Sequence, residues 1–403
     1  MSKIGIYITG LGQSFHQETV EKYATRFKNE MNYNSQGIHY DLKTEKIIYS
    51  DDIESTVVSI INIKDNEQHV FYKFYDFKYK ESLTKKFNDY TILYKNFLLL
   101  LLVVKKFPLL LRRLFIHDSY SRTGQTFYVF SIFFIISLAI LFLLPSTFIF
   151  VKDFLMKYIM EEPDKPKIID KDALTLLFKY FSDFSVMFVV PLTTLLLLIV
   201  PESKTIVTNL ATEFASLDNY IQYGEQSQCI LGNLDLLIEY IAEKEPNSKI
   251  HIHSYSFGTI IAYDLLFPIG NVPSSNSKRM IELLVTIGTP YEFVKAYYPN
   301  FYDNRSVVIE DSIKWINVYS ISDAFATNFR KDAKIGSSEF GLLNSSLLPK
   351  NVNYEIAPVQ KFSIINFITL YHLKIHQHYW DKSTQGQSCM RLIYNEMISA
   401  NLV

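Results

Sequence analysis

Short apolar runs alternate with amphipathic segments over both ends of this chain. The runs are bounded by glycine, proline or polar residues, as is typical of buried strands in a parallel sheet. They predict strands at residues 4–9, 57–63, 69–79, 249–254, 282–287 and 313–320. Apolar residues at helical spacing predict helices at residues 16–31, 205–220, 229–243 and 387–401, and from residue 259. Strands that alternate with helices indicate an α/β fold, with a mostly parallel sheet flanked by helices.

The middle of the chain departs from this pattern. Residues 96–115 are rich in leucine but interrupted by lysine, arginine and proline, which predicts an interfacial helix with its basic residues at lipid headgroups. A buried core helix is the alternative for this segment. Residues 126–151 carry no charge, and about 20 apolar residues suffice to span a bilayer. A second uncharged run, 184–200, predicts another transmembrane helix at 181–200.

Two crossings form a hairpin, so the segments before and after it lie on the same side of the membrane. The sequence therefore predicts an N-terminal part of an α/β domain at 1–90, a two-helix membrane insertion at 91–204 and a C-terminal part at 205–403. Lysine and arginine cluster before the first predicted span, which places the main body in the cytoplasm by the positive-inside rule. The protein is thus expected to be an integral membrane protein.

Composition supports this picture and removes other classes. Of 403 residues, 48% are hydrophobic, which is high for a soluble protein. The net charge of −1 gives no indication of nucleic-acid binding. Two cysteines are too few for a disulfide framework. Residues 1–12 are too short and too broken by glycine for a signal peptide, and are expected to begin the fold.

The segment that carries the chemistry is Lys249–Asp264, KIHIHSYSFGTIIAYD. Its strand, sharp turn and helix match a nucleophile elbow, in which Ser256 stands at the apex of the turn. The amide of Phe257 would then hold the oxyanion of an attacked carbonyl. The usual pattern is G-x-S-x-G, and Ser254 stands here in place of the first glycine. An ordinary strand-to-helix junction with an N-capping serine is the alternative.

The loop after the first strand, Gly10-Leu11-Gly12, has three interpretations. It can be an oxyanion loop that offers the amide of Leu11 to the site. It can be a dinucleotide-binding loop with Asp41 as the ribose-binding acid, but Phe15 stands where the third glycine belongs. It can also be a tight turn with no chemical role.

A nucleophilic serine needs a base, and the base needs an acid that holds its tautomer. Asp323 follows a predicted buried strand and His376 lies further along, so they are the candidate acid and base. Asp311 is the second candidate acid, and His378 is the second candidate base. Asp323 could instead cap a helix that begins at Ala324.

The remaining polar and aromatic residues near these positions have simpler interpretations. Tyr379 and Trp380 are interpreted as packing residues. The pairs His251-x-His253 and His376-x-His378 have no carboxylate or cysteine at ligand spacing, so no metal site is predicted.

The chain resembles the α/β-hydrolases of the lipase and esterase type. The resemblance is carried by YITGLGQ after the first strand, HSYSFGT at the elbow, LVTIGTP, WINVYSISDAFA and HQHYW, and it covers roughly residues 1–80 and 205–403. The family's order of nucleophile, acid and histidine matches Ser256, Asp323 and His376. Similar bacterial lipase-like hydrolases have a histidine three residues before a Tyr-Trp pair, which corresponds to His376. Thr9 is a departure, since a histidine commonly precedes the oxyanion-loop glycine.

The resemblance implies a membrane-anchored serine hydrolase that cleaves an ester with no cofactor. A lipid ester is the expected substrate, because the predicted insertion would hold the site near membrane lipids. Two alternatives remain open. One is a catalytically inactive α/β-hydrolase-like module that binds or signals at the membrane. The other is a membrane nucleotide-binding protein that uses the glycine loop.

Overall fold

The computed structural model describes residues 3–11, 18–35, 37–50, 53–64, 67–115, 171–199, 203–332, 334–342, 345–359 and 371–403, with isolated positions at 136–137, 139–140, 145 and 366. The chain forms two compact units. Unit 1 comprises residues 1–82, 114–128 and 220–403, and unit 2 comprises residues 83–113 and 129–219.

Unit 1 is built on an eight-stranded sheet in the order β2-β3-β4-β1-β5-β6-β7-β8. The strands from β4 through β1 to β8 are parallel, whereas β2 and β3 join as an antiparallel extension beside β4. The strands are β1 (Lys3–Ile8), β2 (Asp41–Ser50), β3 (Ile53–Lys64), β4 (Glu67–Phe77), β5 (Lys249–Tyr255), β6 (Ile281–Ile287), β7 (Lys314–Tyr319) and β8 (Lys350–Asn353).

The predicted α/β class with a mostly parallel, helix-flanked sheet is confirmed. Two strands were not predicted from the sequence. β2 is an exposed edge strand whose charged residues give no apolar run. β8 has only four residues and lies in a stretch whose sequence shows no regular pattern of apolar and polar residues.

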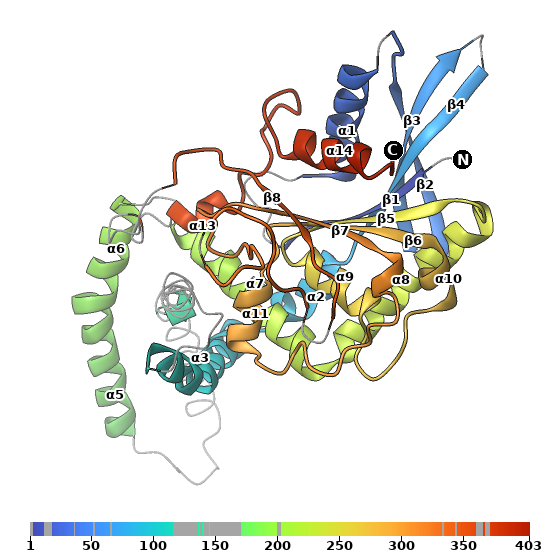
Figure 1. The fold of residues 1–403 in the computed structure, drawn as a ribbon. Coiled ribbons are helices and arrows are strands. Elements are labelled where there is room, and N and C mark those ends of the chain that lie inside the picture. The colour runs from blue at the N-terminus through green and yellow to red at the C-terminus, as the bar shows by residue number, and fades with distance from the viewer. Residues whose placement is uncertain are drawn as a thin grey trace. The chain divides into compact units, whose positions relative to one another are not determined.

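Helices cover both faces of the sheet (Figure 1). α1 (Val20–Asn34) and α14 (Met390–Ser399) pack against each other on one face. α8 (Glu225–Lys244), α9 (Gly258–Leu266) and α10 (Ser275–Met280) lie on the other face. α1 begins later than predicted, because the Thr19 hydroxyl accepts a hydrogen bond from the Lys22 amide and so caps the helix.

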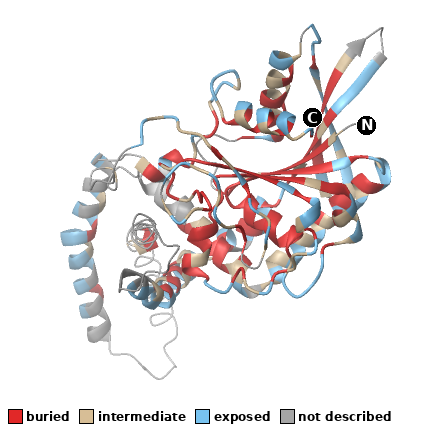
Figure 2. Ribbon diagram, viewed as in Figure 1, coloured by how far each residue is buried: buried red, intermediate tan, exposed pale blue. Residues whose placement is uncertain are grey.

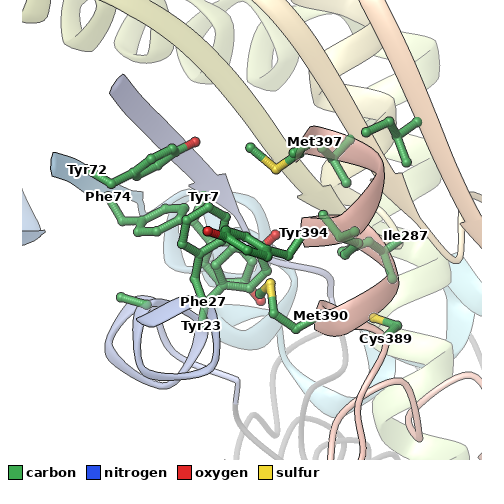
Figure 3. Close-up of a cluster of buried hydrophobic side chains, with 14 of the residues drawn as sticks. Tyr7, Tyr23, Phe27, Tyr72, Phe74, Ile287, Cys389, Met390, Tyr394 and Met397 are labelled. Atoms are coloured by element: carbon green, nitrogen blue, oxygen red, sulfur yellow. The ribbon is translucent and has the colours of Figure 1, made fainter. Parts of the chain in front are cut away.

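The apolar faces of α1 and α14 form a closed core with the sheet. Figure 2 shows the buried residues concentrated along the central strands and on the helix faces turned toward them. Aromatic rings from α1, β1 and β4 meet methionines of α14 in this core (Figure 3). The labelled members are Tyr7, Tyr23, Phe27, Tyr72, Phe74, Ile287, Cys389, Met390, Tyr394 and Met397.

Two histidines of β5 lie in this part of the sheet and are joined by one hydrogen-bond chain. Glu282 accepts from His251 Nε2 at 2.9 Å, so Nδ1 of that ring accepts from the Tyr72 hydroxyl at 2.7 Å. The Tyr72 oxygen then accepts from His253 Nε2 at 3.0 Å, and His253 Nδ1 accepts from the Tyr23 hydroxyl at 2.7 Å. With both imidazoles neutral, every proton of the chain is used once.

The two histidines are expected to lower the stability of unit 1 as the pH drops below about 6.5, whereas Asp76, whose pKa burial raises to about 7, contributes a slope of opposite sign. Burial lowers the pKa of His251 and, further, of His253 below the ordinary value of 6.5. Below pH 6.5 these histidines bind protons in the unfolded chain but stay neutral in the folded chain. Their contribution to the free energy of unfolding is therefore highest above pH 6.5. Each histidine lowers it by at most about 1.4 kcal/mol per pH unit, between pH 6.5 and the lowered pKa of that histidine in the folded chain. Thermal unfolding followed between pH 7.5 and 5.5 measures this slope.

The matched variants are His253→Gln and His378→Gln. The first removes one buried imidazole and should make the dependence on pH shallower. The second removes an exposed imidazole that lies outside this hydrogen-bond chain, and it serves as the control. Equal slopes in the two variants would contradict the assignment.

Unit 2 contains α3 (Ile92–Phe115), which has apolar residues on its exposed side. Lys106 points the other way, is 4% exposed and pairs with Asp218 at 3.6 Å. α3 contains no acidic residue. Its exposed apolar residues are Leu93, Tyr94, Phe97, Leu100, Leu101, Val104, Phe107 and Leu111.

The predicted membrane spans have different outcomes. The span at 126–151 lies outside the described residues, apart from a few isolated helical positions. The span at 181–200 falls on a helical run of α5 (Lys171–Phe184), the π-helical turn η1 (Ser185–Val189) and α6 (Val190–Ile199). None of the described helices combines the length and the apolar composition that a membrane crossing requires.

Candidate active site

Ser256 stands at a strained turn between β5 and α9. Its φ is +50°, a conformation that non-glycine residues rarely adopt. The turn is held on both sides: the Ser256 amide donates to Ile287 O at 2.8 Å, and Ser256 O accepts from the Thr259 amide at 3.0 Å. The residue that caps α9 is Phe257, with no side-chain capping bond. Ser256 is therefore not the helix N-cap that the alternative interpretation required.

The end of β1 lies directly against this turn. A Cβ atom on Gly258 would lie 2.4 Å from Ile8 O and 2.6 Å from Thr9 O, and one on Gly10 would lie 2.8 Å from Ser256 Cβ. Only glycine permits both approaches. This contact explains why the segment after β1 and the turn at Ser256 both need glycine, and it places Leu11 next to that turn.

Ser254 occupies the position where the usual elbow pattern has glycine. Its side chain is fully buried, and its hydroxyl donates to Val285 O on β6 at 2.9 Å. A satisfied hydroxyl costs little in the core. The departure from the pattern is therefore accommodated by the neighbouring strand.

His376 joins Ser256 to Asp323. The Asp323 Oδ2 atom accepts from His376 Nδ1 at 2.8 Å, so Nε2 is left to accept from the Ser256 hydroxyl at 2.6 Å. These three residues come from the ends of β5 and β7 and from just after α13 (Tyr371–Ile375). All three are buried, with exposed fractions of 9% for Ser256, 4% for Asp323 and 8% for His376.

The second candidates lie elsewhere. His378 is exposed, and its Nδ1 atom bonds to Lys374 O instead of the site. Asp311 is exposed in a short 3-10 turn, η2 (Glu310–Ser312). No helix begins at Ala324 in this described stretch, and Asp323 Oδ1 instead accepts from the Phe325 amide at 2.8 Å.

Tyr379 contacts the acid directly, beyond the packing role that the sequence suggests. Its hydroxyl donates to Asp323 Oδ2 at 3.0 Å and accepts from the Ser320 amide at 2.9 Å. Burial, and then the neighbouring Asp323 carboxylate, raise the pKa of Tyr379 well above its usual value of 10, so the hydroxyl remains a donor. The carboxylate thus receives three hydrogen bonds.

If these residues form the triad of an ester hydrolase, Tyr379→Phe is expected to lower turnover about tenfold and to move the acidic limb of the pH–rate profile to higher pH. The variant keeps the ring but removes one hydrogen bond to a charged acceptor. A carboxylate with fewer donors holds the protonated imidazole of His376 more strongly, so a higher pH is needed to free the base. Rates of ester hydrolysis between pH 5 and 9 measure both effects. An unchanged limb would show that this hydroxyl only packs.

His372 also contacts the segment that carries Asp323. No pattern in the sequence indicates this role, apart from the position of His372 one helical turn before His376. Its Nδ1 atom donates to Ser322 O at 2.8 Å, and its own carbonyl accepts from the Ala324 amide at 3.1 Å. One residue of α13 therefore fixes the backbone on both sides of Asp323.

The other predicted chemistry does not assemble in the same way. Asp41 lies on the exposed edge strand β2, beside His39, and not at the end of a parallel strand. Gly12 and Phe15 lie outside the described residues. In the described part of the chain, no three histidine, cysteine, aspartate or glutamate residues gather in a metal-binding group.

Comparison with known protein families, curated proteins and solved structures finds no match to this chain.

Proposed function

We propose that this protein is a serine hydrolase that cleaves an ester through Ser256, His376 and Asp323. The observation that carries the proposal is the directed hydrogen-bond chain from a strained serine through one imidazole to a buried carboxylate. This chain leaves the imidazole with a free lone pair aimed at the hydroxyl that must lose its proton.

The proposed reaction has two halves. His376 Nε2 takes the proton of Ser256 as Oγ attacks the ester carbonyl, and the backbone amides of Leu11 and Phe257 stabilise the oxyanion. The protonated imidazole then gives its proton to the leaving alkoxide, which leaves an acyl-serine. Water attacks this intermediate with His376 again as the base, and the acid product departs. Asp323 stabilises the imidazolium in both halves.

The test is covalent labelling with a fluorophosphonate probe, which modifies activated serines. We expect purified wild-type protein to be labelled on Ser256, as located by mass spectrometry of the peptide. Absence of labelling in folded protein would overturn the hydrolase and favour a non-catalytic binding module.

The substrate is proposed to be a lipid ester, and the body an α/β-hydrolase-like domain on the cytoplasmic face of a membrane. Support comes from α3, which exposes many apolar residues together with Lys105 and Arg112, and whose only charged residues are basic. Such a helix suits the interface of a bilayer that contains anionic lipids. The predicted insertion at 91–204 would hold the site at that surface.

Leu101→Glu combined with Val104→Glu is expected to lower turnover of a bilayer-embedded ester about tenfold. Burial of each apolar side chain in lipid contributes roughly 1.5 kcal/mol or more, and the substitutions also add negative charge. Turnover of a water-soluble short-chain ester should stay unchanged. The matched control is Ile48→Glu, since Ile48 is also exposed and apolar but lies on β2. An equal loss in the control would remove the special role of α3.

A further inference from the structure

Two tyrosines at the junctions with unit 2 pack on the same residue of the candidate site. The chain leaves unit 1 just after Tyr79 and finally returns to it at Tyr220. The ring of Tyr79 stacks on Phe257 with 5.7 Å between centroids, and the ring of Tyr220 meets Phe257 edge-on at 5.3 Å. Both tyrosines are 1% exposed. The two junctions therefore converge on the residue whose amide follows the nucleophile.

Tyr79 also holds the other half of the oxyanion site. Its hydroxyl donates to Thr9 O at 2.7 Å, at the end of β1. This carbonyl lies just before Gly10 and Leu11, and it is packed so closely on Gly258 that a Cβ atom there would lie 2.6 Å from it. One side chain thus touches Phe257 through its ring and fixes the start of the Leu11 segment through its hydroxyl.

Tyr220 is tied to the elbow helix itself. Its hydroxyl donates to Asp264 Oδ2 at 2.7 Å, and Asp264 Oδ1 pairs with Arg305 at 2.6 Å. Arg305 in turn donates to Phe267 O at 2.9 Å, at the end of α9. The ring that packs on Phe257 is therefore held at the helix that Phe257 begins.

We propose that Tyr79 and Tyr220 are positioning residues for the oxyanion site. They act through the Phe257 side chain and the Thr9 carbonyl, and they touch neither Ser256 nor His376 in the bonds described above. An oxyanion amide must lie about 2.7–3.1 Å from the charge that develops, so a small displacement weakens it. This inference rests on the proposed hydrolase function.

The experiment compares wild type with Tyr79→Phe, Tyr79→Leu and Tyr220→Phe. We expect each phenylalanine variant to lower kcat about tenfold with KM within about twofold, and Tyr79→Leu to lower it about a hundredfold. Affinity for a trifluoromethyl ketone, which forms an oxyanion on the serine, should fall by the same factor as kcat. The acidic limb of the pH profile should stay in place, unlike in Tyr379→Phe.

The matched control is Tyr302→Phe. Tyr302 is fully buried in the same unit, and its hydroxyl has no hydrogen-bond partner in the described structure. This variant should keep wild-type kcat, and thermal unfolding of all variants should show that they are folded.

The outcomes separate the two proposals. If the wild type turns over ester and both Tyr79→Phe and Tyr220→Phe keep the wild-type kcat, the positioning role is overturned, but the hydrolase is not. The positioning role is also overturned if Tyr302→Phe loses as much kcat as Tyr79→Phe and Tyr220→Phe, or if these two variants shift the acidic limb of the pH profile. Folded wild type with neither turnover nor labelling overturns the hydrolase and this inference together.

Discussion

Ser256→Ala is expected to lower ester turnover by about 10⁴- to 10⁶-fold. The variant removes the only atom that forms the covalent intermediate, so the base and the acid have nothing to activate. Residual turnover would come from the oxyanion amides and from binding alone. Steady-state hydrolysis of a short-chain ester and fluorophosphonate labelling both measure the loss.

Ser254→Ala is the matched control for this substitution. Ser254 is a second buried serine, on β5 two residues before Ser256, and its hydroxyl bonds to Val285 O and not to His376. We expect this variant to keep most of the turnover and to lose about 1 kcal/mol of stability from the lost hydrogen bond. A Ser256→Ala protein that still hydrolyses the ester at a rate near wild type would rule out the proposed nucleophile.

Gly258→Ala is expected to abolish activity and to destabilise unit 1 by about 3 kcal/mol or more. The new methyl group would lie 2.4 Å from Ile8 O and 2.6 Å from Thr9 O, and both are backbone atoms that no rotamer change can move. The methyl group can be accommodated only if β1 moves away from the elbow, and this movement displaces the Leu11 segment from Ser256. Thermal unfolding and labelling of the variant measure the two effects.

Gly232→Ala separates this clash from the general effect of adding a methyl group. Gly232 lies inside α8, and a Cβ atom there meets nothing within 4 Å. Alanine in a helix interior is favoured over glycine by about 1 kcal/mol, so this variant should be slightly more stable than wild type and fully active. If Gly258→Ala were as stable as Gly232→Ala, β1 could not approach the elbow as closely as described.

The sequence predicts best where a residue's role is set by its neighbours in the chain. Ser256 is marked by the strand before it and the helix after it, and β5 and α9 lie where that pattern puts them. Asp323 and His376 are marked by order, because loops at the carboxyl ends of parallel strands meet at one edge of a sheet. The structure brings these three side chains together.

The sequence does not predict contacts that depend on which way a side chain turns. His376 and His378 are both plausible bases by spacing, and only the direction of the short segment after α13 separates a buried imidazole from an exposed one. Tyr379 reads as packing because an aromatic residue in an apolar stretch usually packs. Its hydrogen bond to Asp323 depends on a turn brought in from β7.

The convergence of Tyr79 and Tyr220 on Phe257 has a thermodynamic consequence. If the protein is the membrane-bound hydrolase proposed above, and the lipid around residues 83–113 and 129–219 biases the positions of these tyrosines, bilayer composition becomes an effector of catalysis, with a coupling free energy between two separate sites. Such coupling is reciprocal for binding equilibria. A ligand that mimics the oxyanion should therefore alter the amide hydrogen exchange of α3 and α6, and a change of lipid should alter that ligand's affinity by the same factor.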